Sequence, residues 1–466
     1  MLAKAFSRSI VRPKSMATTS LKQELRPAQK RKLPETFHIQ TFGCQMNLAD
    51  SSTLAANLLT RGYKRVGDEA EADLIILNTC SVREKAEKRV YGRLGEIYKY
   101  KKRKPHLRIA VVGCMAQRLG EALKEKVPYV DYVLGTDRQF QLADVLEQIE
   151  GTQQVMTAFG HENLDSIQPI KETPYSGFIT ITRGCDNYCT YCIVPYVRGK
   201  EVCHSPDYII DGVKKMVDEG AREVTLLGQN VNSYKLDGLD FPGLLERVAN
   251  ETGIPRIRFM TSHPKDLSKR LVDVMAAVPQ LMGHIHLPLQ SGSNRVLKMM
   301  GRIYTIEHYL RIIDYIRKRI PETAITTDLI VGFPTETEDE FEETLTAVRK
   351  IRYDSAFMFR YSVRPGTVAA RYIDEVSEED KIRRLNKLIK IQQEISYEVN
   401  QREAGQVRLS LVEGFSRRSD KMMRARTEGN KIALFKAGSA ELGSVVPVKI
   451  LSADAFTLHG EIASLN

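Results

Sequence analysis

GFITITRGCDNYCTYC, residues 177–192, joins an apolar, β-rich run to three closely spaced cysteines. Cys185, Cys189 and Cys192 follow the spacing C-x-x-x-C-x-x-C, and Tyr191 precedes the last thiol. Three thiolates on one short loop can bind three irons of a four-iron, four-sulfur cube and leave the fourth iron open to a small molecule. Electron-carrying clusters normally have four cysteines, and structural zinc sites have four closed ligands. The stretch therefore predicts a strand that ends at a chemically active [4Fe-4S] cluster.

Apolar runs and helical patterns continue to alternate along residues 175–402. The strand candidates are GFITIT, EVTLLG, RIRFMT, HIHLPL, AITTDLIVG and SAFMFRYS. Helical patterns fall at 206–219, 266–277, 306–319 and 338–351, and a helix over 378–403 closes the region. Six βα repeats predict an open, partial (βα)6 barrel rather than a closed eightfold one. Active residues of such barrels lie at the carboxyl ends of the strands, so the cysteine loop is expected at the barrel mouth.

A second set of three cysteines precedes the barrel. Cys44, Cys80 and Cys114 each close a short apolar run, in FHIQTFGC, ADLIILNTC and RIAVVGC, and helical patterns over 51–61 and 84–101 separate them. This β-α-β-α-β alternation predicts an α/β unit over residues 37–150 with a doubly wound parallel sheet. Ligands bind beyond the carboxyl ends of such strands, so the three thiols predict a second metal site. The alternative for any one of them is a small buried core residue.

Residues 403–466 change character and predict a small antiparallel β-barrel, a type often used to bind nucleic acid. Its strand candidates are VRLSLVEGF, MMRARTE, KIALFK, VVPVKILSA and AFTLHGEI. A dense group of cations within ten residues favours RNA contact: Arg417, Arg418, Lys421, Arg424 and Arg426. The alternative is a solvated basic edge strand that resists aggregation. Residues 151–174 have mixed polarity and are predicted to be a linker.

The composition is that of a globular chain with an ample core: 42% of the 466 residues are apolar, and no run is long enough to span a membrane. Seven cysteines are too few for a disulfide scaffold, and the two thiolate sets imply a reducing compartment, the cytoplasm. Residues 1–38 hold nine Lys and Arg against two Glu, so much of the net charge of +11 lies there. Residues 1–36 are predicted to be a basic, disordered extension or a misplaced start. An organelle transit peptide and weak attraction to RNA are alternatives.

These motifs together resemble the radical S-adenosylmethionine (SAM) methylthiotransferases, over nearly everything from residue 37 to residue 462. The segments TFGCQMNLADS, NTCSVREKAEKRVYGRLGE and VVGCMAQR resemble the N-terminal unit of that family, and LVEGFSRRSD and RTEGNKIALF resemble its TRAM module. The segments CTYCIVPYVRGKE, LLGQNVNSY, TSHPKD and HLPLQSGSNRVL are most similar to the tRNA branch. The ribosomal-protein branch typically has Pro-Lys where Gln45 and Met46 stand.

The chain departs from the family pattern after the cysteine loop. Val202, Cys203 and His204 stand where the family usually has Arg-Ser-Arg, and Ala425 stands where the TRAM segment usually has Gly. Fewer positive charges are then available to RNA. Cys203 falls outside both cysteine sets and is expected to be an ordinary small side chain.

The resemblance implies an enzyme that adds a methylthio group to C2 of N6-(dimethylallyl)adenosine at tRNA position 37. One SAM would donate the methyl group and another would supply a radical. Two [4Fe-4S] clusters are implied, one on each cysteine set, with the N-terminal one holding the sulfur. The implied partners are the tRNA anticodon stem-loop that carries this base, an electron donor and a sulfur or iron–sulfur carrier, with the chain a monomer and no membrane involved. The alternatives are a methylthiotransferase for threonylcarbamoyladenosine or a ribosomal-protein aspartate, a redox-sensing iron–sulfur RNA-binding protein, and a zinc-bound RNA-binding module.

The resemblance also assigns SAM contacts to residues that follow the barrel strands. Tyr191 would pack near the adenine, and Arg302 and Arg360 are candidates for the SAM carboxylate. Gly332 suits either close backbone approach to the adenosine or a tight turn. The remaining candidates are Gly228, Gln229, Asn230, Ser262, Gln290 and Ser291. A helix-capping turn is the alternative for Gln229 and Asn230, and a simple turn is the alternative for His263, which precedes Pro264.

Overall fold

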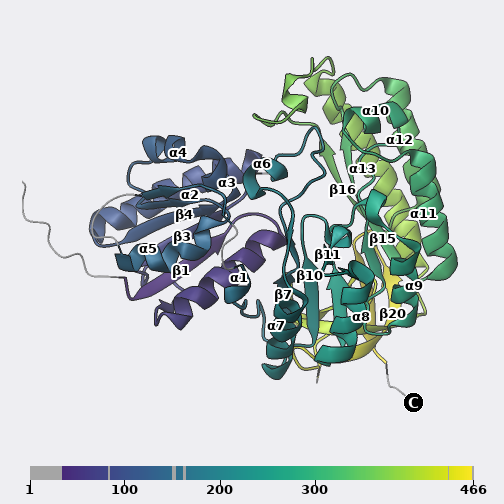
Figure 1. Cartoon of the computed structure of the whole chain (residues 1–466). Coiled ribbons are helices and arrows are strands. Elements are labelled where there is room, and N and C mark those ends of the chain that lie inside the picture. The colour runs from purple at the N-terminus through teal and green to yellow at the C-terminus, as the bar shows by residue number, and fades with distance from the viewer. Residues whose placement is uncertain (1–33, 82–83, 149–153, 161–163, 439, 464–466) are drawn as a thin grey trace, which may run out of the picture.

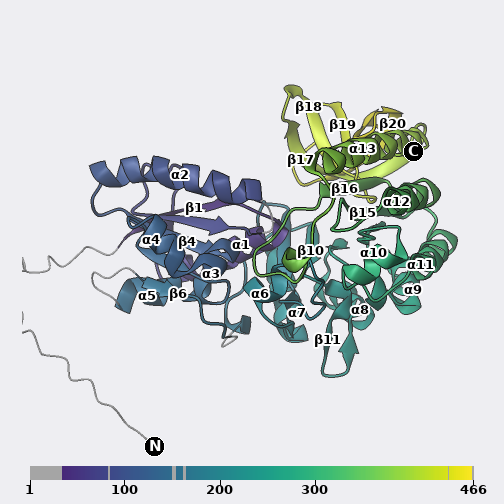
Figure 2. The same ribbon diagram turned by 90° about the horizontal axis from the view of Figure 1, so that it is seen from above.

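The computed structural model describes residues 34–81, 84–148, 154–160, 164–438 and 440–463. An N-terminal α/β unit lies beside a larger α/β barrel, and a small β-barrel packs against the latter (Figures 1 and 2). None of the helices in the described part of the chain combines the length and apolar composition of a membrane span. The predicted basic tail, residues 1–36, falls almost wholly outside the described residues.

The described N-terminal unit is built on a six-stranded parallel sheet of order β2-β1-β3-β4-β5-β6. The strands are β1 (Thr36–Thr41), β2 (Lys64–Arg65), β3 (Leu74–Thr79), β4 (Arg108–Gly113), β5 (Tyr132–Leu134) and β6 (Gln154–Met156). One face of the sheet packs against α1 (Gln45–Thr60) and α5 (Leu142–Gln148), and the other packs against α2 (Glu84–Arg103), α3 (Cys114–Leu119) and α4 (Glu121–Lys126). β3 and β4 are buried along their whole length, which explains their unbroken apolar runs. The predicted doubly wound parallel sheet is confirmed.

Two local features differ from the sequence-based expectation. The helix expected from Ser51 begins at Gln45, because Cys44 is the N-cap residue and the side chain of Asn47 accepts a hydrogen bond from the Cys44 backbone N–H. β6 lies within residues 151–174, the predicted linker, and extends the first sheet by pairing with β5. A three-residue, half-buried edge strand is too short to produce a periodic pattern.

The central region forms a partial barrel whose described strands lie in two parallel sheets, β13-β10-β7 and β14-β15-β16. An isolated parallel bridge pairs Ile257 of β13 with Leu281, which precedes β14. The strands are β7 (Ser176–Thr180), β10 (Glu223–Leu227), β13 (Arg256–Phe259), β14 (His284–His286), β15 (Ala324–Val331) and β16 (Ser355–Arg360). The covering helices are α7 (Pro206–Asp218), α8 (Phe241–Thr252), α9 (Lys269–Ala277), α11 (Ile306–Arg319), α12 (Glu338–Ile351) and α13 (Glu378–Gln401). The predicted strands and the partial (βα)6 barrel are confirmed.

Short elements shape the loops around this frame. β8 (Thr182–Arg183) pairs antiparallel with β9 (Val202–Cys203), so the cysteine loop leaves and returns at one point of the barrel mouth. The other short elements are α6 (Val194–Arg198), α10 (Asn294–Met299), β11 (Lys235–Leu236), β12 (Leu239–Asp240), η1 (Arg138–Gln141), η2 (Leu164–Ser166), η3 (Val231–Ser233), η4 (Pro264–Asp266) and η5 (Ala369–Arg371).

The described C-terminal strands close into a barrel of order β17-β18-β19-β21-β20. They are β17 (Val407–Ser416), β18 (Ser419–Arg426), β19 (Ile432–Lys436), β20 (Val445–Ala453) and β21 (Thr457–Ile462). The predicted antiparallel barrel is confirmed, with β19 and β21 as a parallel pair at the closure. Buried Arg258 fastens this barrel to the central one, because its guanidinium donates to Thr427 O (2.7 Å) and Glu428 O (3.0 Å) while Glu223 accepts from its Nε (2.8 Å).

Candidate active site

The barrel cysteine loop is held in shape by its own backbone. Cys185 N–H donates to Gly199 O (3.2 Å) and Cys192 N–H donates to Cys189 O (2.9 Å). Gly184 has a φ of +77°, and a Cβ there would stand 2.0 Å from Lys200 O, so the turn into the loop requires glycine. Burial, and after it the charge of the neighbouring Cys189 thiolate, raise the pKa of Cys192 to about 12. Crowded thiols of this kind ionise when metal ions compensate their charge, so the donor set fits an iron–sulfur cluster.

Arg302 supplies a buried positive charge to this cysteine set. Its NH1 lies 3.5 Å from Cys189 Sγ, its NH2 donates to Pro288 O (3.0 Å), and its Nε donates to Tyr304 Oη (2.9 Å). The residue predicted as a candidate for the SAM carboxylate therefore lies beside a thiol of the predicted cluster site.

The N-terminal cysteines come to one edge of the first sheet. Cys44 caps α1, Cys80 follows β3, and Cys114 begins α3 after β4. Thr79 and Gly113 are paired across β3 and β4, so the cysteines that follow them are neighbours. A Cβ built on Gly43 would stand 2.9 Å from Cys80 Cβ, which places the Cys44 turn against the same edge. The topology thus brings together three thiols that are far apart in the sequence.

A buried amide pair, which the sequence patterns did not indicate, braces this edge. Asn47 Nδ2 donates to Asn78 Oδ1 (2.9 Å), and Asn78 Nδ2 donates to Asn47 O (2.8 Å). Both residues are fully buried beside a cysteine turn. Their positions, three residues after Cys44 and two before Cys80, were a sequence signal that could have identified them as positioning residues.

Among the described residues, no three His, Cys, Asp or Glu side chains converge closely enough to hold a single metal ion. A four-iron cube is larger than one ion and spreads its ligands further apart, so this observation does not bear on cluster binding.

One cavity of about 810 Å³ connects the two cysteine sets. Cys44 from the N-terminal set and Cys192 from the barrel set both line it, together with Tyr191. Its apolar walls include Phe178, Met260, Leu48, Phe357 and Phe359. Apolar walls with a few convergent polar groups are typical of sites that bind organic molecules.

Several of the predicted SAM contacts carry buried polar atoms without a partner among the described residues. They are Gln229 Oε1, Asn230 Oδ1, Ser262 Oγ and Gln290 Oε1. A buried polar atom is costly unless it is bonded, so these atoms indicate a missing partner. Gln290 also has a φ of +73°, a strained conformation for a non-glycine residue that is typical of functional sites. Acceptors at the ends of three neighbouring barrel segments fit the ammonium and hydroxyl donors of SAM.

Other predicted contacts lie in turns. The Ser291 hydroxyl accepts from Ser293 N (3.2 Å) and lies 3.4 Å from Thr344 Oγ1. A Cβ at Gly228 would stand 2.1 Å from Thr182 Oγ1. Arg360 lines the cavity and forms an ion pair with Glu378.

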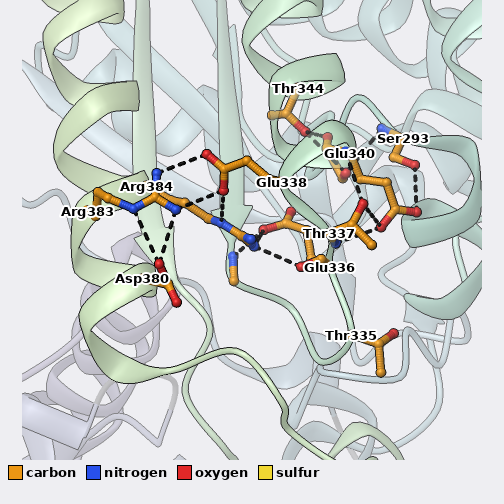
Figure 3. Close-up of polar contacts among 12 residues, drawn as sticks. Ser293, Thr335, Glu336, Thr337, Glu338, Glu340, Thr344, Asp380, Arg383 and Arg384 are labelled. Carbon is orange, nitrogen blue, oxygen red and sulfur yellow. Dashed lines mark hydrogen bonds and ion pairs between the residues drawn. The ribbon is translucent and has the colours of Figure 1, made fainter.

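Gly332 lies in a turn fastened by a carboxylate. Its N–H donates to Glu336 Oε2 (2.6 Å), and Arg384 NH1 donates to the same oxygen (2.9 Å), within the network around Glu336 and Glu338 in Figure 3. Gly332 has a φ of +66°, and a Cβ there would meet Lys381 Cγ at 2.3 Å. Of the two roles predicted for Gly332, this geometry favours the tight turn.

The five predicted RNA contacts divide into two groups. Arg417 and Arg418 are exposed at the turn between β17 and β18, and Lys421 is exposed near the start of β18; these three residues are called the hairpin cations below. Arg424 Nε lies 3.0 Å from Glu413 Oε2, and Arg426 forms an ion pair with the same carboxylate. Arg426 and Glu413 line the cavity, and Arg424 pairs with the same Glu413, so these two arginines face the barrel rather than the tip of the hairpin.

The departures from the family pattern have structural roles. Val202 and Cys203 form β9, and Cys203 packs against the barrel core. His204 Nδ1 donates to Asp165 Oδ1 (2.6 Å), which ties the predicted linker to the barrel. Burial lowers the pKa of His204, so it is neutral near pH 7 and does not replace the family's cation. His263 Nδ1 accepts from Lys265 N (3.2 Å), as in the turn role considered for it.

Three family models match this chain. The Uncharacterized protein family UPF0004 matches residues 36–135, the Radical SAM superfamily matches residues 179–348, and the TRAM domain matches residues 401–463. Together they cover the N-terminal sheet, the partial barrel and the small β-barrel.

Named relatives match along nearly the whole chain. The tRNA-2-methylthio-N(6)-dimethylallyladenosine synthase of Desulforamulus reducens is 46% identical over 434 residues, which cover 91% of this chain and 95% of that protein. The enzyme of the same name from Moorella thermoacetica is 45% identical over 439 residues, covering 92% and 99%. Among solved structures, the radical S-adenosylmethionine methyltransferase TsrM from Kitasatospora setae aligns with a TM-score of 0.55 at 13% identity, covering 70% of this chain and 72% of that one. This last likeness concerns the fold.

Proposed function

The chain belongs to the family of the tRNA-2-methylthio-N(6)-dimethylallyladenosine synthases, within the radical SAM superfamily, and on that premise we propose that it adds a methylthio group to C2 of N6-(dimethylallyl)adenosine at tRNA position 37. It is therefore an enzyme, a methylthiotransferase, and membership of the superfamily implies one [4Fe-4S] cluster and SAM. A second cluster on Cys44, Cys80 and Cys114 is part of the proposal.

The observation that supports the proposal is the cavity shared by the two cysteine sets. Cys44 and Cys192 line the same space of about 810 Å³, and its aromatic walls can hold a base with an apolar substituent. A reaction that joins a sulfur atom to a carbon radical needs both partners in one chamber that excludes water.

The residues have distinct tasks in this proposal. When bound, the clusters and SAM would supply the radical that removes hydrogen from C2, the methyl group and the sulfur atom. Cys185, Cys189 and Cys192 would hold the first cluster, with Arg302 against Cys189. The buried oxygens of Gln229, Asn230, Ser262 and Gln290 would orient SAM, and Tyr191 would form the wall beside it. Phe178, Phe357 and Phe359 would position the base.

The remaining partners follow from this chemistry. The hairpin cations would bind phosphates of the anticodon stem, while one base is splayed out of the loop into the cavity. An electron donor must reduce the barrel cluster, and a sulfur or iron–sulfur carrier must reload the N-terminal one. We place the enzyme in the cytoplasm, where thiolates stay reduced. We propose that it acts as a monomer.

The test is anaerobic reconstitution of the full chain and of single cysteine variants, followed by iron analysis and mass spectrometry of nucleosides from isopentenylated tRNA. The wild type should bind about eight irons, and Cys114→Ala and Cys185→Ala should each bind about four and form no methylthio product. Cys203→Ala is the matched control and should bind about eight, because Cys203 packs against the barrel core.

The outcomes separate the alternatives. Formation of 5′-deoxyadenosine from SAM without a methylthiolated dimethylallyladenosine would point to threonylcarbamoyladenosine or a ribosomal-protein aspartate as the acceptor. Absence of 5′-deoxyadenosine from an iron-loaded protein would refute the enzyme and favour redox sensing. Zinc in place of iron would refute both cluster assignments.

A further inference from the structure

A buried group of three charges joins the two cysteine sets. Asp50 lies on α1, six residues after Cys44, and Arg198 ends α6, six residues after Cys192. Arg183 NH1 donates to Asp50 Oδ1 (2.8 Å), and Arg198 NH2 donates to Asp50 Oδ2 (2.8 Å). Each of the three side chains is at most 5% exposed. The N-terminal unit and the barrel therefore meet at a buried ion cluster beside their cysteines.

This cluster has more positive charge than negative charge. Two guanidinium groups share one carboxylate, which leaves an excess of one positive charge in a buried place. Arg183 NH2 also donates to Thr136 O (3.1 Å), and the Arg183 guanidinium lies over the ring of Phe140. Arg183 Nε and Arg198 NH1 are both buried and have no hydrogen-bond partner among the described residues, and Val197, the neighbour of Arg198, packs against Cys114. A buried charged donor without an acceptor costs free energy of folding, so Arg198 NH1 indicates that a bound group supplies its acceptor.

The N-terminal cysteines lie beside Arg198. Cys114 packs against Ile193 and Val197, the latter being the residue before Arg198. Burial raises the pKa of Cys114, and the charge of Arg198 opposes that rise. The barrel set shows the same relation, because buried Arg302 places its NH1 3.5 Å from Cys189 Sγ.

We propose that Arg198 is a positioning residue for the N-terminal metal site: its NH1 donates to Cys114 Sγ or to an inorganic sulfide beside it, and its charge favours the reduced state of the core. The inference rests on the proposed function, which assigns a cluster to Cys44, Cys80 and Cys114. Hydrogen bonds to sulfur and nearby positive charge raise the reduction potential of an iron–sulfur cluster, because reduction adds negative charge to it. Arg198 also follows Cys192 on one short segment, so the same residue fixes the position of the barrel loop relative to the N-terminal site.

The test measures the N-terminal site alone, in the full chain with Cys185, Cys189 and Cys192 replaced by Ala. Arg198→Met removes the donor and the charge, and Arg198→Lys keeps the charge but loses the planar fork. Arg183→Met is the matched control, because it removes the other arginine on Asp50 and leaves NH1 of Arg198 in place. Each protein is reconstituted anaerobically, its iron is counted, and its reduction potential is titrated by electron paramagnetic resonance.

We expect about four irons per chain and a potential that shifts to more negative values in Arg198→Met, less in Arg198→Lys, and least in Arg183→Met. Equal shifts in Arg198→Met and Arg183→Met, or an unchanged potential in both Arg198 variants, would overturn the assignment of NH1. If Arg198→Met does not fold or load, Arg198→Lys decides by the same criterion against Arg183→Met. Failure of the parent chain with intact Arg198 to bind iron would instead refute the N-terminal cluster of the proposed function.

Discussion

Asp50→Asn should strongly destabilise the junction between the N-terminal unit and the barrel. The Asp50 side chain is fully buried and accepts from Arg183 and Arg198 at 2.8 Å each, so the amide would leave two buried guanidinium groups without a counter-charge. Removing one partner of a buried ion pair costs about 3–5 kcal/mol. One kcal/mol corresponds to roughly 2–4 °C in Tm for a domain of 150–250 residues, so the expected drop is about 6–20 °C.

Asp144→Asn provides the matched control. Asp144 also pairs with an arginine, Arg61, at 2.6 Å, but the two side chains are 41% and 39% exposed. An exposed pair contributes roughly 0–1 kcal/mol, so this variant should lose no more than about 4 °C. Calorimetry under anaerobic conditions at matched iron content measures both variants. If Asp50→Asn melted within the range of Asp144→Asn, the idea that this charge cluster holds the two units together would be refuted.

Three further expectations concern separate parts of the molecule. Burial raises the pKa of Glu172 from 4.5 to about 7, so the folded protein loses stability relative to the unfolded chain as the pH rises from about 4.5 to 7. Glu172→Gln should therefore make Tm fall less over that pH range. An unchanged slope of Tm against pH would contradict this expectation. Gly184→Ala should lose the barrel cluster, about four irons, because a Cβ would meet Lys200 O at 2.0 Å, whereas Gly220→Ala, with a φ of +92° but open space, should keep its iron. Replacing the hairpin cations with Ser should lower the salt dependence of tRNA affinity by roughly 2–3 in log–log slope. Replacing Lys214 and Lys215, which are exposed on α7 and lie on the other side of the molecule from β18 in Figure 2, should not lower it.

The architecture could be predicted from the sequence because each unit repeats a simple local pattern of apolar and polar residues. Alternating apolar runs and helical stretches predicted both parallel sheets, and α11 and α12 begin and end at the predicted residues. Short half-buried elements gave no such signal. β6 therefore falls within the predicted linker, and α1 begins before its predicted start because Cys44 is an unusual N-cap residue.

The metal-binding residues could be proposed because thiols at loop spacing are rare and chemically specific, even before three dimensions are known. The hairpin cations show the limit of this reasoning. Five basic residues within ten positions looked alike, yet strand alternation and Glu413 turn Arg424 and Arg426 toward the barrel and leave the other three exposed.

The amino-acid sequence by itself determined the order of the three units, their strand and helix types, and the spacing of the two thiol sets, because these depend on neighbours within a few residues. The tertiary structure decided that Cys44 and Cys192 line one cavity, and that Asp50 meets Arg183 and Arg198 across 133 and 148 positions of the chain. Partner choice for a buried charge depends on which surfaces exclude water from each other, and that is a property of packing between units rather than of any local pattern.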